Sequence, residues 1–544
     1  MHRAGHWRDV VLTDCLDRWA TERPDRLAVV DHNSETGERT ALTFRELAER
    51  VARIATGLAR LGVGRGDVVS YQLPNWWHFH ALHLACLRLG AVSNPLMPIF
   101  RERELGFMLG LAESKILIVP RRFRGFDHQA MAQRLRPALP ALRHLLVIGG
   151  EGELSFEAPM AQAGPAADML RPDPDEVIEL LYTSGTTGEP KGVLHTSNTL
   201  FSNVIPYGAR LGLSGEDVVL MASPMAHQTG FMYGMMLALW LGATNVLQDV
   251  WDPRRAADII AAEGVSFTMA STPFLADLTE VAQDRPDAFR SFRIFLAGGA
   301  PIPRVLARRA AGALDAAIVP GWGMTENGAL AIGKPGEPAE KTFETDGYPL
   351  PGMAVRVVDA EAGPLPTGTE GRLQARGCSN FVGYLKRPDL YGTDADGWFD
   401  TGDLARLDAD GYVRITGRSK DIIIRGGENI PVVEIEQLLY RHPAVIEAAI
   451  VAMPDPRLGE RCCAFVVTRQ GQAVALADLV AFLEQNGVSR HYMPERLEVV
   501  PEMPKTPSGK IQKFRLRAMA RDLVPTGPGS AADPRPRAAD APAR

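Results

Sequence analysis

A loop rich in hydroxyl and glycine residues, at 181–192, is the clearest candidate for chemistry in the chain. It reads L-Y-T-S-G-T-T-G-E-P-K-G and follows a mostly apolar segment at 177–181. Glycines let backbone N–H groups close around an anion, hydroxyls donate to phosphate oxygens, and a lysine adds positive charge. Pro190 stands where a Walker A loop has its second glycine, so the loop is of another kind. The pattern predicts a phosphate-binding loop rather than a solvated turn.

Three later segments have residue types that suit the rest of a nucleotide. Gly298 and Gly299 follow an apolar stretch, and a glycine pair at a strand end lets main chain approach a flat ring closely. Glu326 ends the run G-W-G-M-T-E, and a carboxylate is a hard oxygen ligand for Mg²⁺. Asp403 ends a T-G-D turn, and its two acceptor oxygens suit a vicinal diol. Because a single such residue is commonly an ordinary turn residue, the inference depends on their order along the chain.

In this order, the segments resemble the motifs of the adenylate-forming superfamily, which includes acyl-CoA synthetases, peptide-synthetase adenylation domains and luciferases. The likeness spans residues 20–515. It implies an ATP-dependent carboxylic acid:CoA ligase that forms an acyl-adenylate and pyrophosphate, then acyl-CoA and AMP, with Mg²⁺. The nucleotide contacts that it implies come from Thr183, Ser184, Gly185, Thr186, Thr187, Gly188, Lys191, Gly299, Ala300, Pro301, Gly321, Trp322, Gly323, Met324, Asp403 and Arg418.

The resemblance also assigns catalytic roles. Lys510, in P-K-T-P-S-G-K, would bridge the acid's carboxylate and the α-phosphate, where negative charge concentrates during attack. Glu326 and Thr187 would hold Mg²⁺, Thr325 would contact phosphate, and His227 would lie beside the acyl carboxylate.

One aromatic residue departs from the family pattern. Trp322 stands where tyrosine is usual. Stacking on adenine survives this exchange, whereas any role of a phenolic hydroxyl is lost.

A mobile C-terminal lid follows from the same resemblance. Lys420 matches the hinge, about which a small domain would turn between two arrangements. One arrangement places Lys510 at the adenylate. The other presents the CoA-binding loop, formed by Arg425, Gly426, Gly427 and Glu428, to pantetheine.

The expected acid is a medium-chain aliphatic or alicyclic monocarboxylate. In acetate-specific relatives a tryptophan stands at the position of Gly323, so we expect a deeper pocket here. We expect the acyl pocket to be lined by His227, Phe231, Met232, Gly323 and Met324. The segments around 226–231 and 247–253 look most like cyclohexanecarboxylate:CoA ligases and short- to medium-chain fatty acid:CoA ligases. Aryl acids stay open.

Three rival readings remain. A stand-alone adenylation enzyme could load a carrier protein, because the 425–429 loop would serve either thiol. A luciferase-like oxygenase is a second rival. A non-catalytic nucleotide-binding protein is a third, disfavoured because Lys510, Glu326 and Asp403 are all present.

Composition excludes other classes of protein. The formal net charge is −6, which argues against nucleic-acid binding. Five cysteines without a C-x-x-C pattern argue against a disulfide framework or zinc site, and Cys462 and Cys463 are expected on opposite faces of one strand. The uncharged stretch 218–248 contains Pro224, Gly230 and Gly242, so we expect strand, buried helix (231–241) and strand rather than a membrane span. A cytoplasmic enzyme is expected, and a homodimer is left open.

Helix and strand patterns that alternate along the chain predict an α/β fold with mostly parallel sheets. A capping box at Thr43 and Glu46 opens one helix, and Asn75 is expected to cap another that runs to residue 89. Helices are also expected at 253–263, 274–281, 432–441 and 476–484. Short strands after residue 353 indicate a β-rich subdomain.

The chain divides accordingly into three expected parts. Residues 1–419 form an AMP- and acyl-binding domain, and residues 420–524 form a small α+β lid domain. Residues 525–544, rich in proline, alanine, glycine and arginine, form a disordered tail.

Overall fold

The structure is a computed structural model that describes residues 1–161, 168–183, 190–299, 302–419, 421–425, 428–430, 432–455, 458–470, 472–488, 490–506, 509–521 and 523. The chain forms two compact units. The first is Met1–Ile415 together with Gly509 and Lys510, and the second is Thr416–Thr506 with the chain from Ile511 onward.

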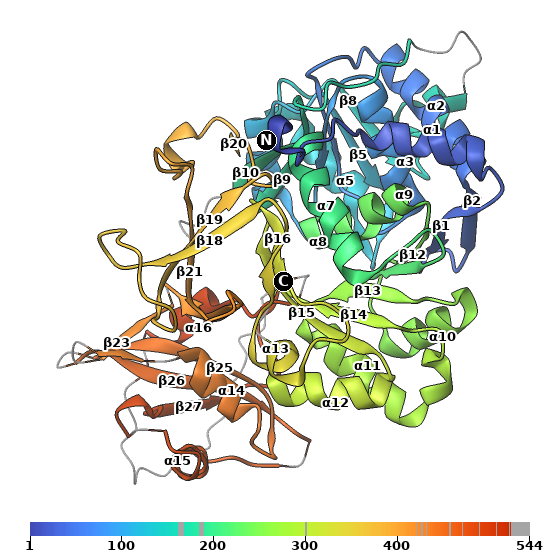
Figure 1. The fold of residues 1–544 in the computed structure, drawn as a ribbon. Coiled ribbons are helices and arrows are strands. Elements are labelled where there is room, and N and C mark those ends of the chain that lie inside the picture. Colours follow the sequence, from blue (N-terminus) through green and yellow to red (C-terminus); the bar gives the residue numbers. More distant parts are fainter. Residues whose placement is uncertain are drawn as a thin grey trace. The chain divides into compact units, whose positions relative to one another are not determined.

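The first unit contains a nine-stranded sheet with a parallel centre and antiparallel edges (Figure 1). The parallel strands are β15, β14, β13, β11, β12 and β1 in spatial order, and β16, β17 and β2 add the antiparallel edges. Their bounds are β1 Leu27–His32, β2 Arg39–Thr43, β11 Val218–Met221, β12 Thr244–Gln248, β13 Phe267–Ala270, β14 Ile294–Ala297, β15 Ala317–Met324, β16 Gly328–Ile332 and β17 Tyr348–Pro349.

A seven-stranded sheet carries the other half of the first unit. Strands β9, β4, β3, β5 and β8 run parallel, and β10 and β20 close one edge in antiparallel pairing. Their bounds are β3 Val68–Tyr71, β4 Val92–Pro95, β5 Ile116–Pro120, β8 His144–Ile148, β9 Val177–Thr183, β10 Lys191–Thr196 and β20 Gly383–Tyr384.

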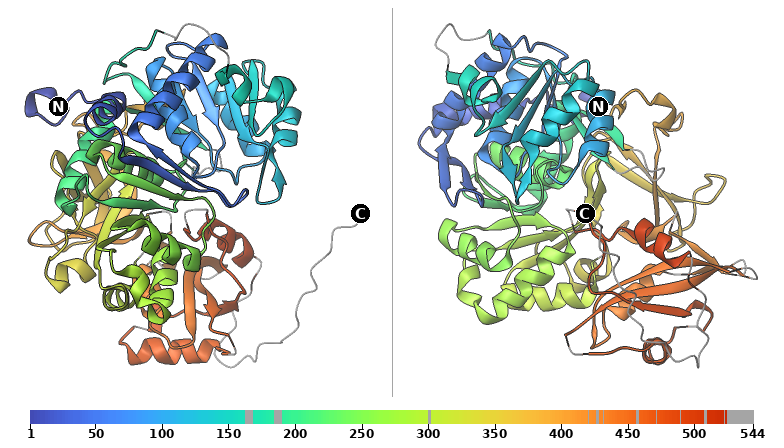
Figure 2. Two further views of the ribbon diagram at one scale, coloured as in Figure 1. Left: turned by 90° about the vertical axis from the view of Figure 1, so that its right-hand side faces the viewer. Right: turned by 180° about the vertical axis from the view of Figure 1, so that it is seen from behind.

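Helices cover both sheets (Figure 2), and the largest hydrophobic core joins residues of both sheets with helices α1, α2, α3, α7 and α9. Successive strand residues point to opposite faces, so Val29 lies in this core and Val30 in a second one beneath α10, α11 and α12. The α-helices of this unit are α1 Leu12–Glu22, α2 Phe44–Arg60, α3 Trp77–Arg88, α4 Glu102–Ala112, α5 His128–Leu135, α6 Glu157–Ala161, α7 Ser197–Leu211, α8 Gln228–Gly230, α9 Leu237–Leu241, α10 Pro253–Glu263, α11 Thr272–Asp284, α12 Arg304–Leu314 and α13 Ala339–Glu344.

Smaller elements complete the first unit. A third, antiparallel sheet has the order β18–β19–β21–β22, with bounds β18 Met353–Val358, β19 Gly371–Gly377, β21 Phe399–Leu407 and β22 Val413–Arg418; the last strand continues past Ile415. A two-stranded hairpin is formed by β6 Arg122–Phe123 and β7 Phe126–Asp127. Short 3₁₀ helices lie at His2–Ala4, Arg136–Ala138, Gly152–Leu154, Pro286–Phe289 and Pro388–Leu390.

The second unit is an α+β fold around one sheet, in the order β24–β23–β26–β25 with β27 beside β26. Its elements are β23 Ile423–Arg425, β24 Glu428–Ile430, α14 Val432–Leu439, β25 Val445–Asp455, β26 Gly459–Thr468, α15 Leu476–Gln485, a 3₁₀ helix Arg490–Tyr492, β27 Arg496–Val499 and α16 Lys513–Ala520. Cys462 and Cys463 lie on β26 and face different hydrophobic clusters, which confirms their predicted opposite orientation. All five cysteines are buried and free.

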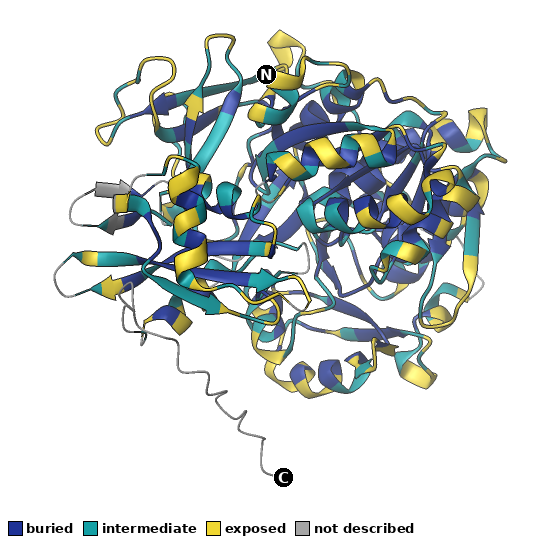
Figure 3. Cartoon of the chain, turned by 90° about the horizontal axis from the view of Figure 1, so that it is seen from below, coloured by how far each residue is buried: buried dark blue, intermediate teal, exposed yellow. Residues whose placement is uncertain are grey.

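Most expected elements form where the sequence predicts them. Thr43 and Glu46 make the predicted capping box of α2, and α10 has the predicted bounds. Gly242, in a left-handed conformation, ends α9 as expected. Along the described residues, no helix is long and apolar enough to cross a membrane. Figure 3 shows surface helices with one buried and one exposed side, as amphipathic sequences require.

Two helix predictions are wrong in detail. Asn75 does not cap α3, because its amide donates to the carbonyls of Met221, Ser223 and Gln248 and its carbonyl accepts from Met225 N–H. Its side chain therefore links the loop after β3 to the loops after β11 and β12, and α3 begins two residues later.

The helix expected at 231–241 is the second difference. Its first half is a π-helix, Phe231–Met236, preceded by α8 and continued by α9. Hydrophobic pattern cannot distinguish α from π winding in a run that is apolar on all sides.

Candidate nucleotide and acyl site

The strands that flank the predicted phosphate loop form an antiparallel pair. Thr183 ends β9, Lys191 begins β10, and the two residues are partners in the ladder. The loop residues Ser184, Gly185, Thr186, Thr187 and Gly188 lie outside the described residues. The Lys191 ammonium lies 4.8 Å from the ring centroid of Tyr384, which belongs to the neighbouring strand β20.

The glycine segments predicted to contact adenine lie on adjacent strands. Gly298 follows β14, and a Cβ atom on it would stand 3.0 Å from the carbonyl oxygen of Gly321 on β15. Gly299 has φ +78°, a conformation that favours glycine. Sequence segments more than twenty residues apart thus come together with their backbones in close approach. Ala300 and Pro301 lie outside the described residues.

Trp322 and Asp403 meet directly. The indole Nε1–H of Trp322, on β15, donates to Asp403 Oδ2 at 3.0 Å. Asp403 is buried on β21, where its own N–H donates to Thr401 Oγ1. The stacking residue and the ribose acceptor predicted from sequence are therefore neighbours.

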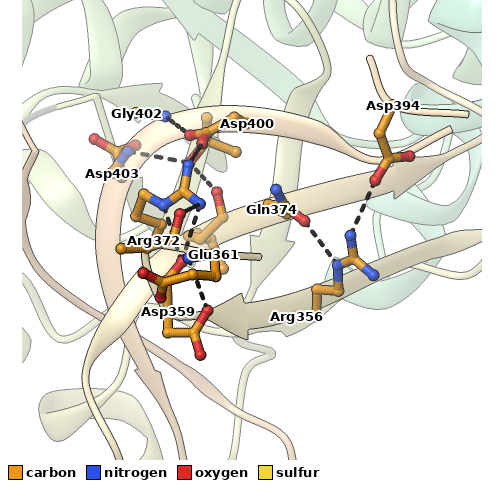
Figure 4. Close-up of polar contacts among 12 residues, drawn as sticks. Arg356, Asp359, Glu361, Arg372, Gln374, Asp394, Asp400, Gly402 and Asp403 are labelled. Atoms are coloured by element: carbon orange, nitrogen blue, oxygen red, sulfur yellow. Dashed lines mark hydrogen bonds and ion pairs between the residues drawn. The ribbon is translucent and has the colours of Figure 1, made fainter. Parts of the chain in front are cut away.

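The T-G-D segment expected to be a turn lies inside strand β21 of the third sheet, where Gly402 takes φ +73° (Figure 4). Gly402 N–H donates to Asp400 Oδ1 at 2.9 Å, and Arg372 Nη1 donates to Asp400 Oδ2 at 2.8 Å. Arg372 also donates to the Asp359 carbonyl at 2.9 Å. Charge-assisted hydrogen bonds of this kind hold this part of β21 more firmly than neutral ones would.

Glu326 is 6% exposed, and its carboxylate accepts a hydrogen bond from Tyr384 Oη at 2.7 Å. Burial, followed by the neighbouring Glu326 charge, raises the pKa of Tyr384 well above its ordinary value, so the hydroxyl keeps its proton and donates. No cluster of three or more His, Cys, Asp or Glu that could hold a metal occurs among the described residues. A single carboxylate fits Mg²⁺ bound mainly through substrate phosphates, which is how Mg²⁺ commonly sits beside ATP.

His195 was missed by the sequence analysis. Its Nε2–H donates to the carbonyl of Thr325 at 2.8 Å, and its Nδ1 accepts from Thr199 Oγ1 at 3.0 Å. Burial lowers the pKa of His195 to about 4, so the ring is neutral at pH 7. This residue joins the strand after the phosphate loop to the Thr-Glu segment. The sequence signal that could have identified His195 is its position three residues after Gly192, the last glycine of the predicted phosphate loop.

His227 lies at the N-cap of α8, where its Nδ1 accepts a hydrogen bond from Thr229 N–H at 3.2 Å. Desolvation, followed by the charge of Lys510, lowers the pKa of His227 to about 4. The ring is therefore neutral at pH 7, and its proton sits on Nε2, which can donate to an acceptor such as a carboxylate.

A buried pair beside His227 was also missed. Gln228 Nε2 donates to Glu179 Oε2 at 3.3 Å, and Oε1 of each residue has no hydrogen-bond partner among the described residues. Burial raises the pKa of Glu179 to about 8, so most of this carboxyl is neutral at pH 7. Glu179 is the only charged residue in an otherwise apolar strand. A single charged residue of this kind gives no sequence signal that its side chain is buried.

The reason given from sequence for Gly323 is not supported. A Cβ atom at this position would lie 1.9 Å from the Gly328 carbonyl oxygen and 2.6 Å from Ala329 Cα. The β15–β16 turn therefore requires glycine for close backbone approach, and a side chain there would meet main chain rather than an open pocket. Among the other predicted pocket residues, Phe231 and Met232 are buried in the main core, and Met324 is half-buried.

The predicted lid residues are described in part. Gly509 and Lys510 belong to the first unit, in keeping with the effect of Lys510 on His227. Arg418 is exposed, and Arg425 donates to Glu495 at 2.6 Å within the second unit. Lys420, Gly426 and Gly427 lie outside the described residues, as does the side chain of Glu428.

These residues lie on the first unit and form three groups of contacts. Trp322 donates to Asp403, and Tyr384 contacts both Glu326 and Lys191. The third group is His227, whose neutral imidazole can donate to an acid, with the charge of Lys510 near it. Such a set can bind a purine nucleotide with its cation and place a carboxylate against the α-phosphate.

Comparison with known proteins gives a consistent result. The family described as AMP-binding enzyme matches residues 16–385, and the AMP-binding enzyme C-terminal domain matches residues 434–510. A medium-chain fatty-acid–CoA ligase of Escherichia coli strain K12 is 36% identical over 520 residues, covering 94% of this chain and 91% of its own.

One further relative and one solved structure are similar over nearly the whole chain. A salicyl-AMP ligase / salicyl-S-ArCP synthetase of Mycobacterium tuberculosis is 37% identical, covering 96% of this chain and 93% of its own. The crystal structure of ATP-bound MatB from Rhodopseudomonas palustris superposes with a TM-score of 0.84 at 27% identity, covering 94% and 99% of the two chains.

Proposed function

Because the chain belongs to the AMP-binding enzyme family, we propose that it joins a medium-chain aliphatic or alicyclic monocarboxylic acid to CoA. The family assignment makes it an ATP-dependent acid-activating ligase with ATP and CoA as substrates and Mg²⁺ as cofactor.

In the proposed first step, an acid carboxylate oxygen attacks the α-phosphorus of ATP, and the bond to the β-phosphate breaks to release pyrophosphate. His227 Nε2–H orients the carboxylate, and Lys510 bridges it to the α-phosphate. Asp403 and Trp322 hold the ribose and adenine. Glu326 would hold Mg²⁺, which would supply positive charge to neutralise the phosphates.

In the proposed second step, the CoA sulfur attacks the acyl carbon, loses its proton, and AMP leaves with the electron pair of the broken bond. We propose that residues 420–524 turn about Lys420 between the steps, bringing the 425–428 loop to the pantetheine. The two steps need different protein groups near the acyl carbon. A lid that rotates between the steps can bring each set of groups there in turn.

The observation that carries the proposed acid is the apolar run after His227. Phe231, Met232, Met235 and Met236 are all buried, and residues 218–248 contain no charged side chain. The nearby Glu179 is mostly neutral at pH 7 and so offers little counter-charge for an amine. A monocarboxylate with an apolar body suits these surroundings, as does the similarity to a medium-chain fatty-acid–CoA ligase.

A second candidate is an aryl acid transferred to a carrier protein. The similarity to a salicyl-AMP ligase / salicyl-S-ArCP synthetase favours it. So does the Glu179–Gln228 pair, whose Oε1 atoms have no hydrogen-bond partner among the described residues. Gln228 Oε1 could accept a hydrogen bond from a ring hydroxyl, and the protonated Glu179 carboxyl could donate one to it.

The deciding experiment supplies Mg-ATP and a panel of acids, namely acetate, octanoate, cyclohexanecarboxylate, benzoate, salicylate and malonate, each with and without CoA. Mass spectrometry then identifies the products. Acyl-AMP without CoA and acyl-CoA with it, from octanoate or cyclohexanecarboxylate, supports the proposal. Acyl-AMP that persists in the presence of CoA favours a carrier protein, and a preference for salicylate favours the aryl acid.

We also propose that the enzyme works in the cytoplasm, where ATP and CoA are supplied. Fractionation of cells that express the tagged chain tests the location. Light scattering on the purified enzyme decides between a monomer and the homodimer left open by the sequence.

A further inference from the structure

We propose that Tyr384 is a positioning residue for nucleotide activation: its hydroxyl sets the orientation of the Glu326 carboxylate while its ring carries the Lys191 ammonium. The inference rests on the proposed role of Glu326 toward Mg²⁺. It adds a residue that contacts neither the acid nor the nucleotide in the proposed mechanism.

Two hydrogen bonds fasten Glu326 to the segment that carries Tyr384. The Tyr384 hydroxyl donates to Glu326 Oε1 at 2.7 Å, and Phe381 N–H donates to the Glu326 carbonyl at 2.7 Å. Side chain and backbone of Glu326 are thus held by residues only three positions apart. A buried carboxylate gains more from a charge-assisted hydrogen bond than an exposed one, because water does not compete for it.

The Tyr384 ring is held by contacts of its own. Its strand pairs with β10, with Tyr384 opposite Val193, and Phe381 packs edge-on against the ring with centroids 4.7 Å apart. The Lys191 ammonium lies 4.8 Å from the ring centroid. A cation at this distance is attracted by the ring face.

One rigid ring therefore connects the end of the phosphate loop with the Thr-Glu segment. Lys191 and Glu326 are the positive and negative groups expected at the triphosphate and its cation. The Tyr384 side chain contacts both groups, and its strand β20 is paired with β10. A hydroxyl that merely satisfied a buried carboxylate would stabilise the fold but would not affect cation-dependent binding of the nucleotide.

The test measures ATP binding by calorimetry without acid or CoA, once in EDTA and once across a Mg²⁺ titration. Tyr384→Phe removes only the hydroxyl. We expect it to reduce the Mg²⁺-induced gain in ATP affinity by about ten-fold, the scale of one hydrogen bond to a charged group, and to leave binding in EDTA unchanged. The matched control is Tyr391→Phe, whose hydroxyl donates to the Phe381 carbonyl at 3.1 Å within the same aromatic cluster.

Glu326→Gln separates this inference from the function on which it rests. If Glu326→Gln keeps the full Mg²⁺ gain, the proposed metal role of Glu326 is wrong, and the inference fails with it. If Glu326→Gln abolishes the gain but Tyr384→Phe retains it, only the Tyr384 inference fails. Equal losses in Tyr384→Phe and Tyr391→Phe would also overturn it, because packing of the cluster would then explain both. In the double variant we expect no loss beyond that of Glu326→Gln alone.

Discussion

The indole of Trp322 donates a hydrogen bond to the carboxylate of Asp403, and the two residues are 81 positions apart in the chain. One belongs to the large parallel sheet and the other to the small antiparallel sheet. The tyrosine usual at this position has its hydroxyl at the tip of the ring and no N–H at the ring edge. Trp322 can therefore orient the ribose acceptor in addition to stacking on adenine.

Trp322→Phe should weaken ATP binding by about ten-fold, because stacking is kept while a hydrogen bond to a buried charge is lost. The KM for the acid should stay within about two-fold. Isothermal calorimetry with ATP and steady-state kinetics with the acid measure the two effects. Trp398→Phe is the control, since Arg356 and Arg376 cover the Trp398 ring on the same sheet. Unchanged ATP affinity in Trp322→Phe would mean that the indole N–H is dispensable.

Lys510→Ala should lower adenylate formation by at least about a hundred-fold, the scale of one lost electrostatic contact to a transition state. Thioester formation from supplied acyl-AMP should be largely retained, because the second step does not need Lys510 to bridge the carboxylate and the α-phosphate. Pyrophosphate release reports the first step, and mass spectrometry of acyl-CoA reports the second. Lys505→Ala serves as the control, because Lys505 pairs with Glu447 within the second unit. Equal loss of both steps would contradict the assigned role.

Gly323→Ala should destabilise the fold by several kcal/mol, since its Cβ would overlap the backbone at 328–329. Thermal unfolding should show this before any change in the preferred acid appears. Gly312→Ala, on helix α12, is the control. Outside its own helix, no atom of the described residues lies within 4 Å of the added Cβ, and the exchange should be neutral or stabilising by about 0.5–1 kcal/mol. A stable Gly323→Ala enzyme with a shortened acid range would restore the pocket explanation.

Glu179→Gln should change how stability depends on pH. Burial raises the pKa of Glu179 from 4.5 to about 8, so the folded protein keeps a proton that the unfolded chain releases in this window. The free energy of unfolding contributed by Glu179 therefore falls as pH rises from 4.5 to 8, by roughly 1.4 kcal/mol per pH unit, and is level above pH 8.

Relative to the wild type, Glu179→Gln should thus gain stability between pH 5 and pH 8, which urea unfolding at several pH values can measure. Asp31→Asn provides a comparison, because burial raises the pKa of Asp31 to about 7. The stability of Asp31→Asn relative to the wild type should therefore stop rising near pH 7, about one pH unit below the corresponding point for Glu179→Gln. A pH-independent difference between Glu179→Gln and the wild type would show that Glu179 is ionised in the folded protein.

Local patterns predicted most elements of the fold because their causes are local. The capping box at Thr43, the proline that opens α10 and the glycine that ends α9 act within a few residues of themselves. Asn75 is the instructive exception. A short polar side chain before a helix is usually a cap, but three carbonyls from distant loops compete for its amide here.

The site was predictable where a motif is contiguous and not where residues meet through pairing of distant strands. Glu326 and Asp403 are read directly from their segments. The contact between Tyr384 and Glu326 depends on β20 adding to β10 across nearly two hundred residues, which no short pattern records. Gly323 shows the opposite limit, a motif position that has a backbone cause. A family comparison suggested a role in substrate choice, whereas the neighbouring backbone explains the residue.

The burial of all five cysteines has a practical consequence at the bench. Burial raises the pKa of Cys15, Cys86, Cys462 and Cys463 to about 12 and also raises that of Cys378. Colorimetric disulfide reagents react with thiolates, and these side chains offer almost none at neutral pH. With the native enzyme, such a reagent would therefore measure only the loss of free CoA thiol. A reaction with the protein's own thiols in the same assay would indicate that the enzyme has unfolded.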